Sequence, residues 1–255
     1  MQQEVGLAGF LQRGLEAGDQ PVRQVADELA SKQLADADTF TRLAMGEGYD
    51  FTEYRFINGE NLEGYLFPDT YLVGREMDPE AIIKKMLDTF GKKVAGPLRP
   101  RIVAVNKARF GLGEASFAEG LNRILPMASL VEREAKIAKD RPLIAAVLWN
   151  RLSKKMRLEV CATVSYRPGE STNNKSKVYL TDLRVDSPYN TYVHAGLPPA
   201  PICNPGLASI KAALYPANSD YLFYVARPDG SHVFSRTFQE HLAAKRREQG
   251  IGNRE

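Results

Sequence analysis

The sequence predicts an α+β fold, in which helices and strands occupy separate parts of the chain. Apolar residues recur at helical spacing through much of the 255-residue chain, whereas its last third alternates short strand-like runs with loops. Strands and helices also do not alternate regularly, as they would in a parallel βαβ fold. We therefore expect a mixed domain with a central helical pair and C-terminal strands.

Four elements are expected before residue 100. They are an amphipathic helix, a second capped helix start, a strand or turn, and a third helix, at residues 22–30, 38–43, 60–72 and 79–95. Asp78 is placed to cap the third helix, and Pro97 and Pro100 are expected to end it, because proline cannot continue a helical hydrogen-bond pattern.

The second half begins with the helical pair. Helices are predicted over 116–139 and 142–153, followed by a strand over 158–166. Residues 187–192 lead into residues 196–206, which are too rich in proline and glycine for a helix or a central strand, so we expect an ordered loop over 196–206. The elements predicted after this loop are a β-hairpin that turns at Asp229-Gly230 and a final helix, over 221–226, 232–235 and 238–247.

The composition excludes several classes of protein. With 34 basic and 31 acidic residues the charge is nearly balanced, which argues against a nucleic-acid-binding protein. The densest basic stretches are best explained as solvated helix faces: Arg99, Arg101, Lys107 and Arg109, and Lys245 to Arg247. The three histidines lack the spacing of metal ligands, and there is no glycine-rich phosphate loop, so no metal and no cofactor are expected.

Two cysteines, Cys161 and Cys203, are too few for a disulfide scaffold or a zinc cluster. They would pair with each other only in an oxidising compartment. No apolar run is long enough to cross a bilayer, and residues 1–15 do not form a convincing signal peptide.

One carboxylate, Glu132, lies among small residues in a segment predicted to be helical. Ala128, Ser129 and Ala135 lie four before, three before and three after it, so they share its helix face. A carboxylate framed in this way would sit over a shallow hollow that a ligand could fill. Partial burial there would raise its pKa, as a general acid requires. The alternative is a surface glutamate that pairs with Lys136 at i,i+4.

Short motifs follow one another from roughly residue 20 to residue 247. They are Leu62-Glu-Gly-Tyr-Leu-Phe-Pro-Asp-Thr-Tyr71, Ala128-Ser-Leu-Val-Glu-Arg-Glu134, Ala146-Val-Leu-Trp-Asn-Arg-Leu152, Met156-Arg-Leu-Glu159, Ala162-Thr-Val164, Ser187-Pro-Tyr-Asn-Thr-Tyr192, Gly196-Leu-Pro-Pro199, Asn204-Pro-Gly206, Ser209-Ile-Lys-Ala-Ala213, Tyr221-Leu-Phe-Tyr-Val-Ala226, His232-Val-Phe-Ser235 and Glu240-His241. In this order they resemble the endolytic murein transglycosylases of the YceG-like family.

The resemblance implies cleavage of the β-1,4 bond between N-acetylmuramic acid and N-acetylglucosamine within peptidoglycan strands. The muramyl 6-hydroxyl attacks its own anomeric carbon and leaves a 1,6-anhydro end, so one carboxylate suffices where ordinary glycosidases need two. The resemblance assigns the role of general acid and base to Glu132. Because Glu134 lies about 200° further around the helix, we expect it to be structural and to anchor a neighbouring loop.

The same resemblance implies a set of substrate-binding residues with amides and hydroxyls for hydrogen bonds and rings for stacking on sugars. The candidates are Asn150, Glu159, Thr163, Tyr166, Tyr189, Asn190, Tyr192 and Asn204. A structural role is the alternative for each of them. Asn150 would then brace its helix, Tyr189 and Tyr192 would pack the loop, and Asn204 would form a turn before a proline.

The chain departs from the family pattern just before the Thr163-Val164 pair. Glu159 stands where glutamine is usual, and Cys161 stands where aspartate is usual. Two alternatives to a lytic transglycosylase follow. One is a peptidoglycan-binding protein without activity, and the other is a water-using muramidase in which Glu159 is the second carboxylate.

The resemblance also implies a domain organisation and a cellular place. Residues 1–60 correspond to part of a small LysM-like domain, whose first strand would fall near residues 6–20, although that segment is poorly suited to a strand. Residues 61–255 correspond to the catalytic domain. Family members carry an N-terminal transmembrane helix, so we expect a periplasmic enzyme on the inner membrane whose anchor is missing from this sequence. Cell-wall synthases of the elongation machinery are the implied partners.

Overall fold

The computed structural model describes residues 20–74, 77–170 and 181–248. Over these residues the protein is mostly helical, with one two-stranded antiparallel sheet near the C-terminal end. This mixed architecture is consistent with the predicted α+β class. The first 19 residues of the predicted N-terminal domain lie outside the described part, so the division at residue 60 and its LysM-like character stay predictions.

Two short helices open the described chain. Helices α2 (Val22–Ser31) and α3 (Ala37–Ala44) pack on each other, and α3 also contacts α4 (Pro79–Phe90). Asp36 caps α3, because its side chain accepts a 2.8 Å hydrogen bond from the backbone N–H of Thr39. Both predicted N-terminal helices are confirmed, although the second begins slightly earlier than Asp38. The segment 60–72 forms turns and extended loop, without a strand.

Proline marks the start of a helix that the sequence analysis did not predict. Helix α4 continues into the π-helical segment Gly91–Ala95, which confirms the helix predicted over 79–95. Helix α5 (Arg99–Phe110) then follows almost at once, with Pro100 in its first turn. Proline is tolerated there because the first N–H groups of a helix have no partner within it. Gly111 ends α5 in the left-handed conformation, with φ of 70°.

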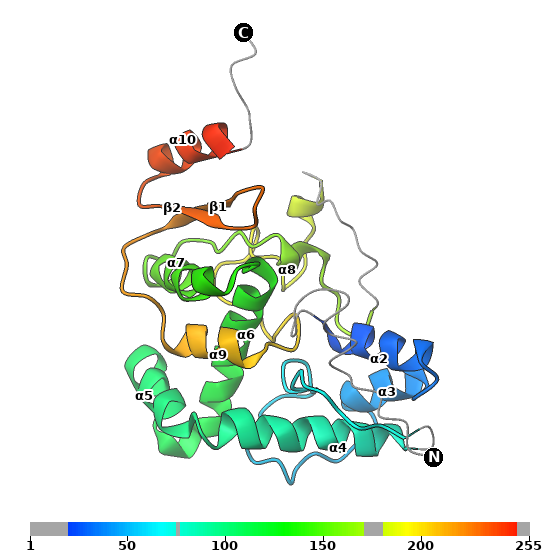
Figure 1. Ribbon diagram of the computed structural model, residues 1–255. Coiled ribbons are helices and arrows are strands. Elements are labelled where there is room, and N and C mark those ends of the chain that lie inside the picture. The colour runs from blue at the N-terminus through cyan, green and yellow to red at the C-terminus, as the bar shows by residue number, and fades with distance from the viewer. Residues whose placement is uncertain (1–19, 75–76, 171–180, 249–255) are drawn as a thin grey trace.

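Helix α6 (Phe117–Glu134) runs through the middle of the molecule (Figure 1). It packs against α5, α7 (Arg141–Ser153), α8 (Ala162–Ser165) and α9 (Leu207–Leu214). Every side chain from residue 124 to residue 132 is buried, so neighbours surround this part of α6 on all sides. The helix ends at Glu134 rather than at the predicted residue 139, because the backbone of Ala135 is extended.

Helix α7 confirms the second member of the predicted pair, but the strand predicted over 158–166 is wrong. That segment contains α8 instead. Two local features explain the difference. Glu159 has a left-handed backbone with φ of 55°, which no regular strand contains, and the Thr163 hydroxyl donates a 2.7 Å hydrogen bond back to the Val160 carbonyl. The β-branched residues therefore fill the core from a turn.

The ordered loop predicted over 196–206 is confirmed, and α9, which was not predicted, follows it. The predicted hairpin is also confirmed. Strands β1 (Phe223–Ala226) and β2 (His232–Ser235) pair antiparallel, with Tyr224 opposite Phe234, and α10 (Phe238–Glu248) covers them as predicted. Three short 3₁₀ turns complete the described elements, at Glu114–Ser116, Ala138–Asp140 and Asp182–Arg184.

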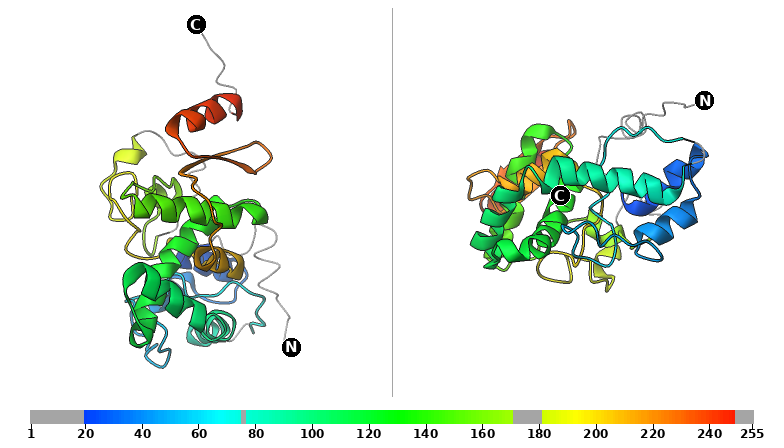
Figure 2. Two further views of the ribbon diagram at one scale, coloured as in Figure 1. Left: turned by 90° about the vertical axis from the view of Figure 1, so that its left-hand side faces the viewer. Right: turned by 90° about the horizontal axis from the view of Figure 1, so that it is seen from below.

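The hairpin and α10 lie at one end of the molecule and α4 lies at the other, as both Figure 1 and Figure 2 show. A continuous hydrophobic cluster joins the two ends, and it includes Val22 and Leu29 of α2 as well as Ile210 of α9. None of the helices in the described ranges is both long and apolar enough to span a membrane.

Candidate functional site

The C-terminal end of α6 carries two carboxylates that face different surroundings. Glu132 and Glu134 are two residues apart, which separates their side chains by about 200° around the helix axis. Glu132 points into the protein toward α7 and α9, whereas Glu134 points toward the hairpin. The two residues must therefore be considered separately.

Glu132 is buried, and both of its carboxylate oxygens accept hydrogen bonds from the protein. Its side chain is 2% exposed. Oε2 accepts a 2.8 Å hydrogen bond from the backbone N–H of Gly206, and Oε1 accepts one of 3.3 Å from the Arg141 guanidinium. Burial raises the pKa of Glu132, as predicted, while Gly206 and Arg141 oppose that shift. The surface pairing with Lys136 considered as an alternative does not occur, because Glu132 pairs with Arg141.

The protein's own loop fills the hollow beside Glu132 that a ligand was expected to fill. The Ser129 hydroxyl accepts a 3.1 Å hydrogen bond from the N–H of Ile202, and the Cys203 thiol donates to the Ser129 carbonyl. Ala128 and Ser129 are both fully buried. The small residues on this face of α6 therefore provide room for residues 202–206, which end at the N-terminus of α9.

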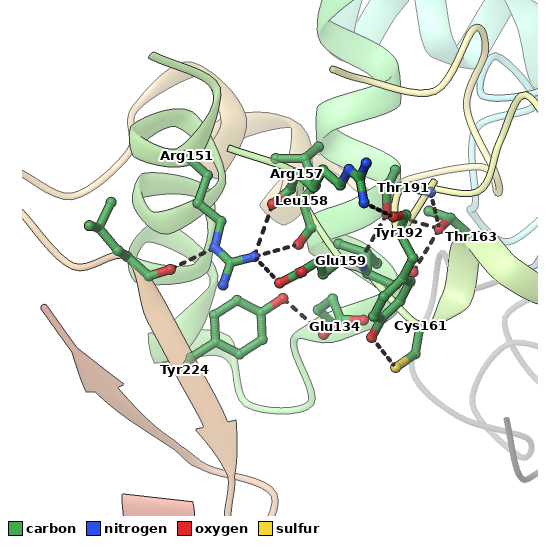
Figure 3. A network of polar contacts seen from close by, with 12 residues as sticks. Glu134, Arg151, Arg157, Leu158, Glu159, Cys161, Thr163, Thr191, Tyr192 and Tyr224 are labelled. Atoms are coloured by element: carbon green, nitrogen blue, oxygen red, sulfur yellow. Dashed lines mark hydrogen bonds and ion pairs between the residues drawn. The ribbon is translucent and has the colours of Figure 1, made fainter. Parts of the chain in front are cut away.

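Glu134 is half-buried and bonded to the hairpin. The Tyr224 hydroxyl donates a 2.9 Å hydrogen bond to its Oε2 (Figure 3). Burial raises the pKa of Glu134, and the Tyr224 hydrogen bond and the neighbouring His232 oppose that shift. The neighbouring loop that Glu134 was expected to anchor is not its partner, because Tyr224 lies on strand β1.

Glu159 lies next to Glu134 and reaches solvent. Its side chain is 50% exposed, and its Oε2 accepts a 3.0 Å hydrogen bond from the Arg151 guanidinium (Figure 3). Arg151 is itself fixed by the carbonyls of Leu222, Arg157 and Leu158. The Arg151 guanidinium therefore holds both the residue just before β1 and the segment that carries Glu159.

Cys161 and Tyr192 lie near Glu134 and Glu159 and contact each other. The Cys161 sulfur and the Tyr192 hydroxyl are 3.1 Å apart, Cys161 is exposed, and Tyr192 is half-buried. The charges of Glu134 and Glu159 both help to raise the pKa of the Tyr192 phenol, which places its ring close to the two carboxylates. We define the Glu134 cluster as Glu134, Glu159, Cys161, Tyr192 and Tyr224.

The remaining substrate-binding candidates use their polar atoms inside the protein. Asn150 donates to the carbonyls of Ser219 and Tyr221, which braces its helix against the approach to β1, as its structural alternative predicts. The Thr163 hydroxyl bonds Val160 and Thr191 and has no exposed surface.

Asn190 organises the loop in which it lies. Its amide donates to the carbonyls of Leu183 and Val185, and its oxygen accepts from the N–H of Tyr192. The side chain has no exposed surface. Asn190 therefore shapes the segment that presents Tyr192 and does not itself reach the surface.

Three further candidates meet around a buried carboxylate, Glu63. Glu63 accepts hydrogen bonds from the Tyr166 hydroxyl at 2.9 Å, the Asn204 amide at 3.3 Å and the N–H of Val22 at the start of α2. Tyr189 packs edge-on against Tyr166, with ring centroids 4.8 Å apart. Burial raises the pKa of Glu63 to about 8. This arrangement links the N-terminal helices to the loop at 204.

The cysteines and the described titratable groups do not form a metal site. Cys161 is exposed and Cys203 is buried, and the two are not joined by the disulfide considered above. His232 pairs with Asp140 at 3.0 Å in a buried contact. Within the described ranges, no group of three or more histidine, cysteine or acidic residues could hold a metal ion.

A separate cavity of about 560 Å³ lies on the α3–α4 side of the molecule. Thr39, Tyr49, Asp50, Asp78 and Lys84 are among its lining residues. None of the residues that line it belongs to the predicted site, and the helices that form it are at the opposite end from the hairpin (Figure 1).

Sequence analysis did not identify Tyr224 and Arg151 as parts of a site. Tyr224 lies in the motif Tyr221–Ala226, and the alternation of that strand indicates which side chains share a face, but nothing in the sequence shows that this face meets the end of α6. Arg151 lies in a motif in the last turn of α7. A basic residue there is favoured by the helix dipole, so its presence does not by itself indicate a site.

This chain is similar to known proteins of one family. The model of the YceG-like family matches residues 17–247. An endolytic murein transglycosylase from Bacillus subtilis (strain 168) is 40% identical over 184 residues, which cover 72% of this chain and 47% of the relative. An endolytic murein transglycosylase from Streptococcus pneumoniae serotype 2 is 34% identical over 181 residues, which cover 70% of this chain and 30% of the relative.

A solved structure shows the same fold. The crystal structure of a YceG-like protein from Listeria monocytogenes is 35% identical in sequence, with a TM-score of 0.76, and the match covers 89% of this chain and 74% of that one. The chain spans about half the length, or less, of the two curated relatives described above.

Proposed function

Because this chain belongs to the YceG-like family, we propose that it is an endolytic lytic transglycosylase acting on peptidoglycan. It would cleave the N-acetylmuramyl-β-1,4-N-acetylglucosamine bond inside glycan strands and leave 1,6-anhydro-muramyl ends. The support is twofold: the relatives that it resembles bear the name endolytic murein transglycosylase, and the end of α6 carries a half-buried residue, Glu134, whose pKa is raised by burial and whose cluster includes the exposed Glu159 and Cys161.

We propose Glu134 as the general acid and base in place of Glu132. A proton donor must come within hydrogen-bond distance of the glycosidic oxygen. Glu132 is 2% exposed, and its two oxygens bind Gly206 and Arg141, whereas Glu134 is half-buried and adjoins the exposed Glu159 and Cys161. Glu132 then holds the N-terminus of α9 and the start of α7 against α6.

The reaction needs one such carboxyl. Burial raises the pKa of Glu134 and so favours its protonated form nearer to neutral pH. The protonated carboxyl gives its proton to the glycosidic oxygen as the bond from that oxygen to the muramyl anomeric carbon breaks. The muramyl 6-hydroxyl then bonds to the anomeric carbon, and its proton returns to the Glu134 carboxylate. No water is consumed, and the enzyme ends in its starting state.

Glu159 and Tyr192 are the proposed substrate-binding residues of the cluster. Both reach the surface next to Glu134, one with a carboxylate for sugar hydroxyls and the other with a ring for a pyranose face. The other predicted contacts, Asn150, Thr163 and Asn190 among them, would support these residues from within, because their polar atoms are engaged inside the protein.

A water-using muramidase is the second candidate, since Glu159 gives Glu134 a carboxylate neighbour. Arg151 lies 3.0 Å from Glu159, and a carboxylate near the acid is what a base that activates water requires. The pairing also takes up one of its oxygens, so we prefer the reaction that uses the 6-hydroxyl.

Product analysis tests the proposed function. The full chain is incubated with purified peptidoglycan, and the released fragments are analysed by mass spectrometry. Anhydro-muramyl ends are expected from the protein and not from its Glu134→Gln variant. Reducing muramyl ends would show a hydrolase, and binding without either product would show a non-catalytic peptidoglycan-binding protein.

The proposed setting follows the family resemblance. The enzyme would work on the periplasmic face of the inner membrane, where it would release or terminate nascent strands next to the synthases that make them. The LysM-like character of residues 1–60 belongs to the same proposal.

A further inference from the structure

We infer that Tyr224 is a positioning residue for Glu134, which determines the carboxyl oxygen that carries the proton delivered to the glycosidic oxygen. The inference rests on the proposed function, in which Glu134 is the proton donor. It concerns a side chain that does not itself have to touch the reacting atoms.

The direction of the hydrogen bond fixes the position of the proton. The Tyr224 hydroxyl donates to Oε2 of Glu134 at 2.9 Å. An oxygen that accepts this bond serves as the carbonyl oxygen of the neutral acid, so the acidic proton is placed on Oε1. Without the phenol, the proton could reside on either oxygen and the carboxyl could rotate. Correct placement of a reacting proton contributes directly to rate.

Tyr224 can do this because the hairpin holds its ring in place. The Tyr224 ring packs edge-on against the His232 ring, with centroids 5.5 Å apart and an interplanar angle of 87°, and it also contacts Phe234 on β2. The phenol is therefore fixed relative to the hairpin.

The hairpin in turn is fixed to the helix that carries the acid. Asp140, in the short connection between α6 and α7, accepts hydrogen bonds from the backbone N–H of His232 at 2.8 Å and pairs with its Nδ1 at 3.0 Å. Asp140 is 4% exposed and His232 is 8% exposed. Arg151 on α7 holds the residue just before β1 through the carbonyl of Leu222 at 2.7 Å. Tyr224 and Glu134 therefore approach each other from two rigidly connected elements.

Several charged or titratable groups surround the pair, and they determine the sign of the expected effect. They are His232 on β2, Arg133 on α6, Arg151 on α7, Glu159 and Cys161 in the segment around α8, and Tyr192 in the loop. Among these surroundings, the Tyr224 hydroxyl stabilises the ionised form of Glu134 by hydrogen bonding. Its removal should make Glu134 a weaker acid.

The test compares Tyr224→Phe with Tyr221→Phe. The second variant is a matched control, because Tyr221 lies on the same chain segment and packs on Phe234, but its backbone carbonyl, not its hydroxyl, makes the recorded hydrogen bond. The measurement is the pH profile of kcat/KM for cleavage of soluble glycan strands, together with the midpoint of thermal unfolding.

For Tyr224→Phe we expect the alkaline limb of the profile to move up by about one pH unit, because the neutral acid persists to higher pH. On the acidic side, where Glu134 is protonated in both proteins, kcat/KM should fall about 3- to 10-fold because the acidic proton is no longer held on Oε1. Tyr221→Phe should leave the limb where it is. An unmoved limb in Tyr224→Phe, or a loss equal at every pH that follows the unfolding midpoint, would overturn the inference.

Glu134→Gln separates this inference from the proposed function. Loss of cleavage in Glu134→Gln with an unmoved limb in Tyr224→Phe would refute the role of Tyr224 alone. Full activity in Glu134→Gln would refute the assignment of the acid, and with it the role of Tyr224.

Discussion

The two glutamates at the end of α6 are close in sequence and differ in nearly every physical respect. Glu132 is enclosed by α6, α7 and the loop before α9, with its charge shared between a guanidinium and a backbone N–H. Glu134 lies at the edge, against a two-stranded hairpin, with a phenol as its hydrogen-bond partner and an exposed carboxylate as its neighbour.

This difference shows how a helix can use adjacent carboxylates for separate purposes. Burial raises the pKa of both, so a raised pKa alone does not identify the catalytic one. The hydrogen-bond partners distinguish the two residues instead. A carboxylate with both oxygens bonded inside the protein stabilises the fold, whereas Glu134 is bonded through Oε2 to Tyr224, which leaves Oε1 as the oxygen that can meet a substrate.

The largest expected effect on stability is that of Glu132→Ala. This change leaves the Arg141 guanidinium and the Gly206 N–H without their acceptor in a buried place. We expect the free energy of unfolding to fall by about 3–5 kcal/mol, as for other buried pairs that lose one partner. Urea denaturation measures it. Glu134→Ala is the matched control, and it should cost only about 1 kcal/mol because it removes one hydrogen bond at the edge. Equal losses would contradict the distinction between the two residues.

Glu63 extends the comparison to a buried carboxylate whose recorded partners are all uncharged donors: Tyr166, Asn204 and the N–H of Val22. Its folded pKa of about 8 lies above the ordinary value of 4.5, so the folded state holds a proton that the unfolded state releases. Stability should therefore be complete below about pH 4.5, fall by about 4–5 kcal/mol as the pH rises to 8, and level off above it.

Denaturation at a series of pH values measures this decrease. Glu63→Gln should remove most of the pH dependence in this range, because the amide does not ionise. A variant that keeps the full slope would show that another group is responsible.

The next effect concerns Glu159, which stands where the family resemblance leads us to expect glutamine. If Glu159 orients the sugar by hydrogen bonding, Glu159→Gln should keep kcat/KM within about threefold, and the products should still end in anhydro sugars. If Glu159 is instead the base of a hydrolase, the same variant should lose reducing-end products by about 100-fold or more. Kinetics and product mass together distinguish these outcomes.

The smallest expected effect is that of Cys161→Asp, which restores the residue usual in the family. A carboxylate placed here, in the cluster that contains Glu134, would disfavour its ionised form. The alkaline limb of the activity profile should therefore move up by about half a pH unit, with little change in maximal kcat/KM. Cys161→Ser, which adds no charge, should not move it. A downward shift in Cys161→Asp would contradict this description of the cluster.

The helices with clear periodicity could be predicted from the sequence, and so could the hairpin. Periodicity reports which side chains face the core, and the Asp229-Gly230 pair signals the turn. Helix α5 was missed because Pro97 and Pro100 were interpreted as terminators, while Pro100 lies in a first helical turn. The strand predicted over 158–166 was wrong because the left-handed backbone of Glu159 has no signal in the residue type.

The site was harder to predict than the fold. The resemblance pointed to the C-terminal end of α6, where we also propose the site, but spacing on a helix does not show what packs against each face. Small residues beside Glu132 indicated a hollow, and only the structure shows that residues 202–206 fill it. Tyr224 reaches Glu134 from 90 positions further along the chain, a contact that no local pattern contains.

The most direct test of the central claim compares Glu134→Gln with Glu132→Gln in one experiment. Both changes remove an acid while keeping its shape, and the yield of anhydro-muramyl ends is measured per folded molecule, with the folded fraction taken from circular dichroism. We predict that Glu134→Gln lowers this yield by about a thousandfold, and that Glu132→Gln keeps at least about a tenth of it. A thousandfold loss in Glu132→Gln, with activity retained in Glu134→Gln, would contradict the assignment.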